Sequence, residues 1–334
     1  MDNELSFFAS ANSGQGFVSF FEDIFSGLKR NYIIKGGPGT GKSSLMKNAA
    51  RAAEDKGMTV ERFYCSSDPD SLDGIIIQEL STGITDGTAP HTRDPKYPGA
   101  ADDIIDLGAF WDKRALTKSR AYIKETVDRK AQLYRDTYSC LNAALTLDRI
   151  IKRRLSQVVE GDTLNSLART YINDIPYVSG KQSIRLTDAI SAKGHCRLLP
   201  YTKQAERIYN IKDSYGIASL FMNGLSQALY GRGMVISYEA LNTDNVNMIY
   251  LPQGRILFCV NADMGEKIDL DALFSNEPDT ESIKAHKNAL LSEAYTLMMQ
   301  ASELHFSLED IYISAMDFDA KEQYEKNLIN EIFT

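Results

Sequence analysis

The sequence predicts an α/β fold of parallel sheets flanked by helices, arranged as two tandem repeats with a long helical insert. Three observations predict it. A short apolar run, a glycine-rich loop and a helical pattern follow one another over residues 30–57. A similar series returns over residues 207–236, and helical periodicity without Gly or Pro fills residues 112–159. The length of 334 residues suits about two domains, and the pattern divides the chain at 1–111, 112–183 and 184–334.

The first element in this order is the glycine-rich loop with its flanking segments. Residues 36–43, "GGPGTGKS", fit the pattern G-x-x-x-x-G-K-[ST]. The preceding "NYIIK" is typical of a buried parallel strand, and the following "SSLMKNAARAAEDKG" has helical spacing with Gly57 as its stop. Strand, loop and helix in this order are the context that a phosphate-binding loop (P-loop) requires.

The residue types of the loop point to a nucleoside triphosphate. Glycine permits backbone conformations that turn N–H groups inward around phosphate oxygens, beside the positive end of a helix. Lys42 is expected to contact the β- and γ-phosphates, and the hydroxyl of Ser43 to bind Mg²⁺. The residues expected to bind the nucleotide are Gly36, Gly37, Pro38, Gly39, Thr40, Gly41, Lys42, Ser43 and Ser44.

An acidic residue is expected to help hold the metal ion with Ser43. The segment "MTVERFYCSS" predicts the next strand, and a weaker strand over residues 80–85 ends at Asp86. Nucleotide-binding α/β proteins place functional residues at the carboxyl ends of strands. Asp86 is therefore the first candidate for the acid, and it joins Lys42 as a candidate catalytic residue. Asp68 and Asp70 remain alternatives, although Asp-Pro-Asp-Ser also suits a turn or a helix cap.

A long Gly- and Pro-rich segment, residues 86–103, follows Asp86. Such loops often act as lids over a site. His91, Arg93 and Lys96 could touch phosphate or substrate there, and a solvated surface loop is the alternative. Glu79 could orient a water for hydrolysis or simply lie on a helix surface.

The second repeat has lost the motif. "YNIKDSYGIASLFMN", residues 209–223, matches "YIIKGGPGTGKSSLMKN", residues 32–48, with a period of 177 residues (209 − 32). Asp213 stands where the first repeat has Gly36, and the later copy is too short to supply counterparts of Gly41 and Lys42. We therefore expect residues 184–334 to form a degenerate P-loop domain that keeps its strands and binds no triphosphate.

The middle of the chain predicts a helix or a helical hairpin from residue 112 to about 157. The apolar residues that recur every three or four positions are Ile123, Val127, Ala131, Tyr134, Tyr138, Leu141 and Leu145. "KRALTKSR" and "IIKRRL" make this insert locally basic. A solvated helix face, a protein partner or a nucleic-acid surface would each fit, and the net charge of −8 weighs against a general nucleic-acid coat.

Four segments together resemble a known family: "FFASANSGQGF", "KGGPGTGKSSLMK", "YCSSDPDSLDGIIIQEL" and "DGTAPHTRDPKYPGAADDIIDLG". The family is an uncharacterised group of bacterial P-loop proteins, generally called ATPases from the motif alone. The similarity runs through about the first 110 residues and extends to the two-repeat plan. It implies a tandem P-loop fold with ATP as the nucleotide, and it supplies no substrate. Members commonly carry a P-loop in both halves, and this sequence departs from that pattern.

The composition narrows the class of protein and the cellular compartment that we expect for it. The chain is 43% hydrophobic and 25% charged, and no apolar run approaches the roughly 20 residues that span a bilayer. The N-terminus lacks a basic segment of the secretory kind. Four cysteines without CxxC spacing argue against a zinc site and a disulfide framework. We expect a cytoplasmic protein with no membrane partner.

Three functions fit these features. The first is an Mg²⁺-dependent ATPase whose single site drives a conformational change. The second is a kinase that passes the γ-phosphoryl group to a small molecule or nucleotide. The third is a nucleotide-gated binding module with little turnover, whose effector surface is the helical insert.

Overall fold

The computed structural model describes residues 5–159, 161–173, 175–276 and 278–334. Residues 1–4, on which part of the expectation about the N-terminus depends, lie outside these ranges. The chain divides into two compact units. Unit 1 comprises Met1–Ala9, Phe25–Asp136 and Thr296–Thr334, and unit 2 comprises Ser10–Ile24 and Thr137–Tyr295.

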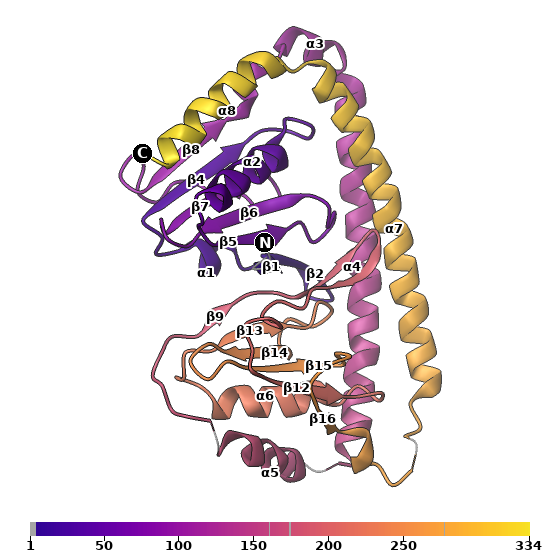
Figure 1. The fold of residues 1–334 in the computed structure, drawn as a ribbon. Coiled ribbons are helices and arrows are strands. Elements are labelled where there is room, and N and C mark those ends of the chain that lie inside the picture. Colours follow the sequence, from indigo (N-terminus) through magenta and orange to yellow (C-terminus); the bar gives the residue numbers. More distant parts are fainter. Residues whose placement is uncertain (1–4, 160, 174, 277) are drawn as a thin grey trace. The chain divides into compact units, whose positions relative to one another are not determined.

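Unit 1 contains a six-stranded mixed sheet in the order β1-β5-β6-β7-β4-β8 (Figure 1). The strands are β1 (Leu5–Phe8), β4 (Arg30–Lys35), β5 (Val60–Tyr64), β6 (Leu72–Ile77), β7 (Thr82–Asp86) and β8 (Asp102–Asp106). Strand β4 lies between β7 and β8 and is parallel to both. Its four middle residues are buried, as expected for an apolar strand covered on both faces.

Two helices cover one face of this sheet. Helix α2 (Lys42–Asp55) packs on the sheet through Leu45, Met46 and a series of alanines, and helix α8 (Phe318–Ile332) adds Leu328 to the same core (Figure 1). Helix α2 ends where the sequence predicts, since Gly57 follows it with a φ of 77°.

The predicted parallel sheet is wrong in part, because β6 runs antiparallel to both of its neighbours. The physical reason is the length of the connections. A parallel crossover needs a dozen or more residues, whereas residues 65–71 and 78–81 alone connect β5 to β6 and β6 to β7. The hydrophobic pattern marks a buried strand without stating its direction.

Unit 2 contains a second six-stranded sheet in the order β9-β13-β14-β15-β12-β16. The strands are β9 (Ser183–Ile184), β12 (Arg207–Lys212), β13 (Val235–Tyr238), β14 (Val246–Leu251), β15 (Ile256–Val260) and β16 (Glu266–Asp269). Every neighbouring pair has the same sense, parallel or antiparallel, as its counterpart in unit 1. Strand β12 therefore takes the place of β4, and the duplication expected from the sequence is present in the topology.

Two hairpins and several helices complete the units. The hairpins are β2 (Ser10–Ser13) with β3 (Gly16–Ser19), and β10 (Asp188–Ser191) with β11 (Gly194–Arg197). The helices of unit 2 include α5 (Gly161–Ile172) and α6 (Ala218–Ala228), which contact each other. Short helical elements are α1 (Phe21–Phe25), α3 (Lys113–Lys118), and the 3₁₀ turns η1 (Leu107–Phe110) and η2 (Asp271–Leu273).

The predicted insert is helical, with one break. Asp112 caps α3, and α4 (Arg120–Ser156) follows after Ser119. The expected apolar stripe is correct near Leu141 and wrong near Val127, which is 44% exposed, and Ala131, which is also exposed. The buried stripe in the first half of α4 shifts to neighbouring positions such as Thr126.

The units do not follow the predicted boundaries at 111/112 and 183/184. Helices α4 and α7 (Glu281–Ser314) each contribute residues to both units. The last part of α7 and all of α8 belong to unit 1, and the β2–β3 hairpin belongs to unit 2. These assignments depend on contacts between residues far apart in the chain, which a sequence pattern does not encode.

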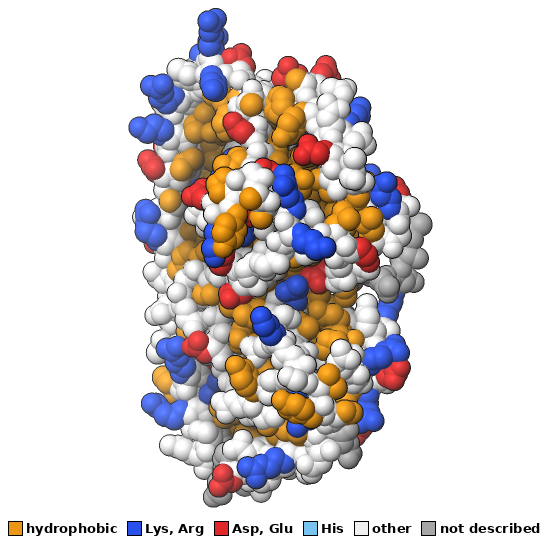
Figure 2. Space-filling view, turned by 90° about the vertical axis from the view of Figure 1, so that its left-hand side faces the viewer, with side chains coloured by type: hydrophobic (Ala, Val, Ile, Leu, Met, Phe, Trp, Pro, Cys, Tyr) orange, Lys and Arg blue, Asp and Glu red, His pale blue; other side chains and the backbone are white. Residues whose placement is uncertain are grey.

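Among the described residues, no helix combines the length and the apolar character needed to cross a bilayer. On the face drawn in Figure 2, basic and acidic side chains are interspersed with apolar ones. An interspersed arrangement is typical of a solvated surface rather than of a track for nucleic-acid phosphates.

Candidate functional site

The glycine-rich loop connects β4 to α2 in the first sheet of unit 1. Gly39 and Gly41 have φ angles of 68° and 83°, a region that favours glycine. Gly36 is confined as well, since a Cβ there would lie 2.8 Å from the Thr40 hydroxyl. Helix α2 begins at Lys42, and its N-cap residue Gly41 has no side chain to cap it. The first N–H groups of the helix have no acceptor within the helix. Open N–H groups at a helix start form a cradle for an anion.

Lys42 lies at this cradle and meets the predicted acid. Its Nζ donates to the carbonyl oxygens of Gly36 at 3.0 Å and Gly37 at 2.8 Å. The same nitrogen lies 3.6 Å from Oδ2 of Asp86, and both side chains are largely buried. Asp86 reaches this position because β7 pairs with β4 in parallel, in a register that places it opposite Ile34. The structure therefore brings together the two residues that the sequence singled out as catalytic.

The oxygen atoms of Asp86 and Ser43 are held by hydrogen bonds. Oδ1 of Asp86 accepts hydrogen bonds from the backbone N–H of Thr88 at 2.8 Å and from its hydroxyl at 2.6 Å. The Ser43 hydroxyl accepts from the backbone N–H of Leu72 at 3.0 Å. Hydroxyl and carboxylate oxygens are the ligands that Mg²⁺ prefers. Ser43 and Asp86 therefore offer oxygen ligands of the kind that Mg²⁺ takes, and the metal ion itself stays a prediction.

The two alternative acids serve a turn between β5 and β6. Oδ2 of Asp68 accepts from the Ser71 hydroxyl at 2.7 Å, and Lys47 donates to the backbone carbonyl of Asp70 at 2.8 Å. These are the turn contacts that the Asp-Pro-Asp-Ser pattern suggested. The carboxylate that forms an ion pair with the P-loop lysine is that of Asp86.

Glu79 occupies a turn and not a helix surface. Glu79 lies in the connection from β6 to β7. Its carboxylate accepts a hydrogen bond from the backbone N–H of Thr59 at 2.8 Å. Strand β7 starts after this turn and ends at Asp86, so Glu79 lies at the opposite edge of the sheet from Lys42. A role in orienting a hydrolytic water is therefore wrong for Glu79.

The segment after Asp86 is anchored to the sheet rather than free. Lys35, at the end of β4, donates to the carbonyl oxygens of Gly87 at 2.9 Å and Arg93 at 2.5 Å. The backbone N–H of Lys96 donates to Asp102 at 2.9 Å. These contacts hold the loop by its backbone.

His91, from the same loop, is buried and joins a polar cluster. Its Nε2 lies 3.0 Å from Oδ2 of Asp73, and the Cys65 thiol completes a group whose ligand atoms all lie within 4.8 Å of one another. Burial lowers the pKa of His91, but the carboxylates of Asp73 and Asp86 outweigh it and leave that pKa above the ordinary value. Burial raises the pKa of the Cys65 thiol well above its ordinary value. Of these three residues, only His91 was expected from the sequence to touch phosphate or substrate.

The last part of helix α7 packs on the glycine-rich loop. A Cβ on Gly39 would lie 2.8 Å from Ile313 and 2.9 Å from the backbone oxygen of Glu309. Burial raises the pKa of Glu309, and the nearby backbone N–H of Gly39 opposes that shift. A carboxylate from α7 thus lies beside an N–H group of the kind that would bind phosphate.

Two more basic groups, on helices α4 and α7, lie close enough to the loop for the charge of Lys42 to act on them. Nζ of Lys130 in α4 lies 3.4 Å from Nδ1 of His305 in α7. Burial, with the charge of Lys42, lowers the pKa of Lys130. Burial and the charges of Lys130 and Lys42 lower the pKa of His305 to about 4. At neutral pH His305 is therefore uncharged.

Lys321 in α8 is buried beside Gly41. A Cβ on Gly41 would lie 3.2 Å from Nζ of Lys321, which pairs with the buried carboxylate of Glu325. Asn48 in α2 donates to the other oxygen of Glu325 at 2.6 Å. Helix α8 therefore presents a second lysine to the loop. No local sequence signal could have found Glu309, His305 or Lys321, because each acts through contacts far along the chain.

The second repeat fills its own loop with a carboxylate. Asp213 accepts from the backbone N–H groups of Tyr215 at 3.1 Å and Gly216 at 2.7 Å through Oδ1. Its Oδ2 accepts from the N–H of Ala218, the first residue of α6, at 2.7 Å. The N–H groups that would receive a phosphate thus bind a side chain of the chain itself. This closure, in addition to the repulsion expected from the sequence, leaves the loop unsuited to an anion.

The second repeat has also lost the acid. Ile34 of β4 faces Asp86 of β7, and Ile211 of β12 faces Val260 of β15. Val260 therefore takes the position of Asp86 and cannot bind a metal ion. The lysine, the open N–H groups and the acid are all absent from the described counterpart in unit 2.

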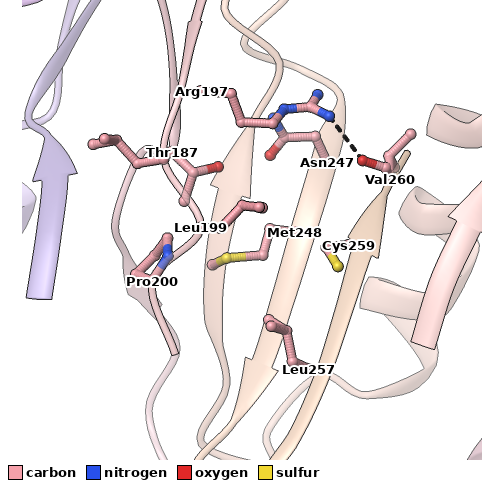
Figure 3. A pocket seen from close by; sticks show the side chains of 10 residues that line it. Thr187, Arg197, Leu199, Pro200, Asn247, Met248, Leu257, Cys259 and Val260 are labelled. Carbon is pink, nitrogen blue, oxygen red and sulfur yellow. Dashed lines mark hydrogen bonds between the residues drawn. The ribbon is translucent and has the colours of Figure 1, made fainter. Parts of the chain in front are cut away.

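Two arginines of unit 2, Arg197 and Arg232, make contacts within that unit. Arg197 pairs with the buried Asp188 at 3.0 Å and donates to the carbonyl oxygen of Val260 at 2.8 Å, at the rim of a small pocket (Figure 3). Arg232 donates to the carbonyl of Ile175 at 2.8 Å. Further pocket residues are Thr187, Leu199, Pro200, Asn247, Met248, Leu257 and Cys259.

Comparisons with protein-family models, with curated proteins and with solved structures found no match to this chain in any of the three.

Proposed function

We propose that the chain is an Mg²⁺-dependent ATPase of the tandem P-loop type, with one nucleotide site in unit 1. The observation that carries the proposal is the ion pair of Lys42 with Asp86, 3.6 Å apart at the glycine-rich loop. The loop adds positive-φ glycines and a helix start without a side-chain cap. Lysine, acid and open N–H groups are the three parts that a triphosphate site of this kind needs.

Each residue of the site has a defined role in this proposal. Lys42 exchanges its contacts with the carbonyls of Gly36 and Gly37 for the β- and γ-phosphate oxygens. Ser43 and Asp86 hold Mg²⁺, which neutralises charge on the same phosphates when it is bound. Thr88 fixes the carboxylate of Asp86 through two hydrogen bonds. The resemblance to the tandem P-loop family favours ATP as the nucleotide.

Binding is proposed to act on helix α7. Phosphate oxygens and the Glu309 carboxylate would compete for the N–H of Gly39, and two anions do not share one donor without cost. Phosphate therefore displaces Glu309, and with it the end of α7 that packs on the loop. This displacement would couple nucleotide binding to a conformational change, as the first of the three functions requires.

Substitution of Lys42 tests the proposal. In Lys42→Ala, ATP binding should weaken on the order of 100-fold, because a charge-assisted contact worth about 1.5–3 kcal/mol is lost. Phosphate release with Mg²⁺ should fall with it. Lys47→Ala is the matched control, since Lys47 lies on the same helix and donates instead to the Asp70 carbonyl. Unchanged ATP affinity and turnover in Lys42→Ala would refute the site.

A further inference from the structure

The cluster of Cys65, Asp73 and His91 has the composition of a metal site. One thiol, one carboxylate oxygen and one imidazole nitrogen lie within 4.8 Å of one another. Asp73 is 5% exposed and His91 is 7% exposed, so both ligands are held inside unit 1. None of the three residues is among the proposed Mg²⁺ ligands Ser43 and Asp86, although the charge of Asp86 acts on His91.

The sheet places the three residues at one edge. Cys65 follows the last residue of β5, Asp73 lies near the start of β6, and His91 follows β7. Because β6 is antiparallel to both neighbours, its start lies at the same edge as the ends of β5 and β7. The mixed direction of the sheet, which the sequence did not reveal, is what brings the ligands together.

A β-bulge in the pairing of β5 with β6 orients the carboxylate of Asp73. Phe63 pairs with Gly74, and Tyr64 pairs with Leu72, so Asp73 is the extra residue of a β-bulge. Bulges redirect a side chain and often lie next to functional sites. The backbone N–H of Cys65 donates to the carbonyl of Ser71 at 2.9 Å, which fixes the neighbouring chain.

The second repeat keeps the bulge and lacks the ligands. Ser237 pairs with Met248 and Tyr238 with Val246, so Asn247 takes the place of Asp73. The residue after Tyr238 is Glu239, at the position of Cys65. Asn247 donates to Asp188 at 2.6 Å. The bulge therefore belongs to the shared fold, and the thiol–carboxylate–imidazole set is particular to unit 1.

We propose that Cys65, Asp73 and His91 bind one divalent, thiophilic metal ion of the Zn²⁺ class. A sulfur, nitrogen and oxygen set suits Zn²⁺, which takes thiolate, imidazole and carboxylate in tetrahedral geometry, and it does not suit Mg²⁺. In such a site the ligand atoms stand about 3.3–3.7 Å apart, so small side-chain shifts suffice. A dication balances one thiolate and one carboxylate, so the buried site gains no net charge.

Three protein ligands leave a fourth position open. Closed structural zinc sites have four protein ligands, whereas sites with three keep a position for water or another small ligand. The proposed ion therefore binds an exchangeable fourth ligand at the same edge of the sheet as Lys42. The proposal does not depend on ATP binding, and either can fail without the other.

Cobalt substitution of the full-length protein tests the site. After removal of metal by a chelator, one equivalent of Co²⁺ should give a thiolate-to-cobalt charge-transfer band, and Zn²⁺ should abolish it by competition. Cys65→Ser should lose the band, and His91→Gln should weaken Co²⁺ binding by about 100-fold or more. Cys140→Ser is the matched control and should keep the band.

A second variant shows that loss of the band in Cys65→Ser does not come from misfolding. Combined substitution of Cys140, Cys196 and Cys259 by Ser leaves Cys65 as the sole thiol, and it should retain the band with folding checked by circular dichroism. X-ray absorption of the wild-type protein with Zn²⁺ should show one sulfur among the ligands. Absence of a thiolate band and of a sulfur ligand in the wild type, or a band that persists in Cys65→Ser, would overturn the proposal.

Discussion

Replacement of Asp213 by Asn should destabilise the start of helix α6. The Asp213 carboxylate accepts three backbone hydrogen bonds, from Tyr215 and Gly216 on one oxygen and from Ala218 on the other. An Asn side chain has nearly the same size but only one acceptor oxygen. Its NH₂ group would face an N–H donor, so at least one buried donor would lose its partner.

The magnitude follows from these contacts. A hydrogen bond to a charged acceptor contributes about 1.5–3 kcal/mol, and loss of a helix cap costs about 0.5–2 kcal/mol. Asn keeps one or two of the three contacts of Asp213, which is only 9% exposed. We therefore expect a loss of about 2–3 kcal/mol, which corresponds to roughly a 30- to 150-fold change in an equilibrium constant.

Hydrogen exchange measured by mass spectrometry reads the effect locally. Peptides that cover residues 213–220 should exchange about 30-fold faster in Asp213→Asn than in the wild type. Ser214→Ala is the matched control, since its exposed hydroxyl donates to Asp271 alone. Fluorescence of Trp111, the single tryptophan, reports on unit 1 and should change little under native conditions.

A small effect on exchange would refute the role given to the Asp213 carboxylate. If Asp213→Asn changed exchange at residues 213–220 no more than Ser214→Ala did, the carboxylate would not be filling the loop. The second loop would then be unable to bind a triphosphate because it lacks the lysine and the acid, and not because a carboxylate fills it.

Three further outcomes follow from the site in unit 1. Asp86→Asn should lower Mg²⁺-dependent turnover about 100-fold with a smaller effect on nucleotide binding, and the same behaviour in Asp68→Asn instead would move the metal to the other acid. Glu309→Gln should tighten ATP binding several-fold, measured by calorimetry, because a neutral amide competes less for the Gly39 N–H, whereas the exposed Asp310→Asn should not. By NMR, His305 should titrate near pH 4, and bound ATP should raise its pKa. Because its folded pKa lies below the unfolded value of 6.5, the stability from neutral His305 is present above pH 6.5 and is lost as pH falls toward 4. The charged groups that act on His305 are Lys130, Lys42 and Asp68, and Glu309 lies on the same helix. A pKa of 6.5 or higher without ATP would contradict that burial.

The local part of the site could be predicted because its signals are local. The strand, loop and helix around Lys42 depend on residues adjacent in sequence, and each residue type has its own conformational reason. Asp86 could be placed because the weak strand predicted over residues 80–85 ends there. The loss of the second loop was visible in Asp213, although its hydrogen bonds to the loop were not.

The other parts of the site depend on contacts between residues far apart in the sequence. The direction of β6 is set by short connections, and it brings Cys65, Asp73 and His91 together although no CxxC spacing marks them. Glu309 reaches the loop of Gly39 from α7, 270 positions away (309 − 39). Hydrophobic periodicity specifies which residues are buried, and it carries no information on which distant element buries them.

The central claim is that the chain has one nucleotide site, and calorimetric titration with Mg²⁺-ATP tests it most directly. The account predicts one ATP per chain, binding weakened on the order of 100-fold in Lys42→Ala, and nearly unchanged binding in Lys212→Ala. Lys212 matches Lys35 at the end of the strand, and it pairs with Asp271 at 3.0 Å. A stoichiometry of two, or binding that survives in Lys42→Ala and is lost in Lys212→Ala, would contradict the account.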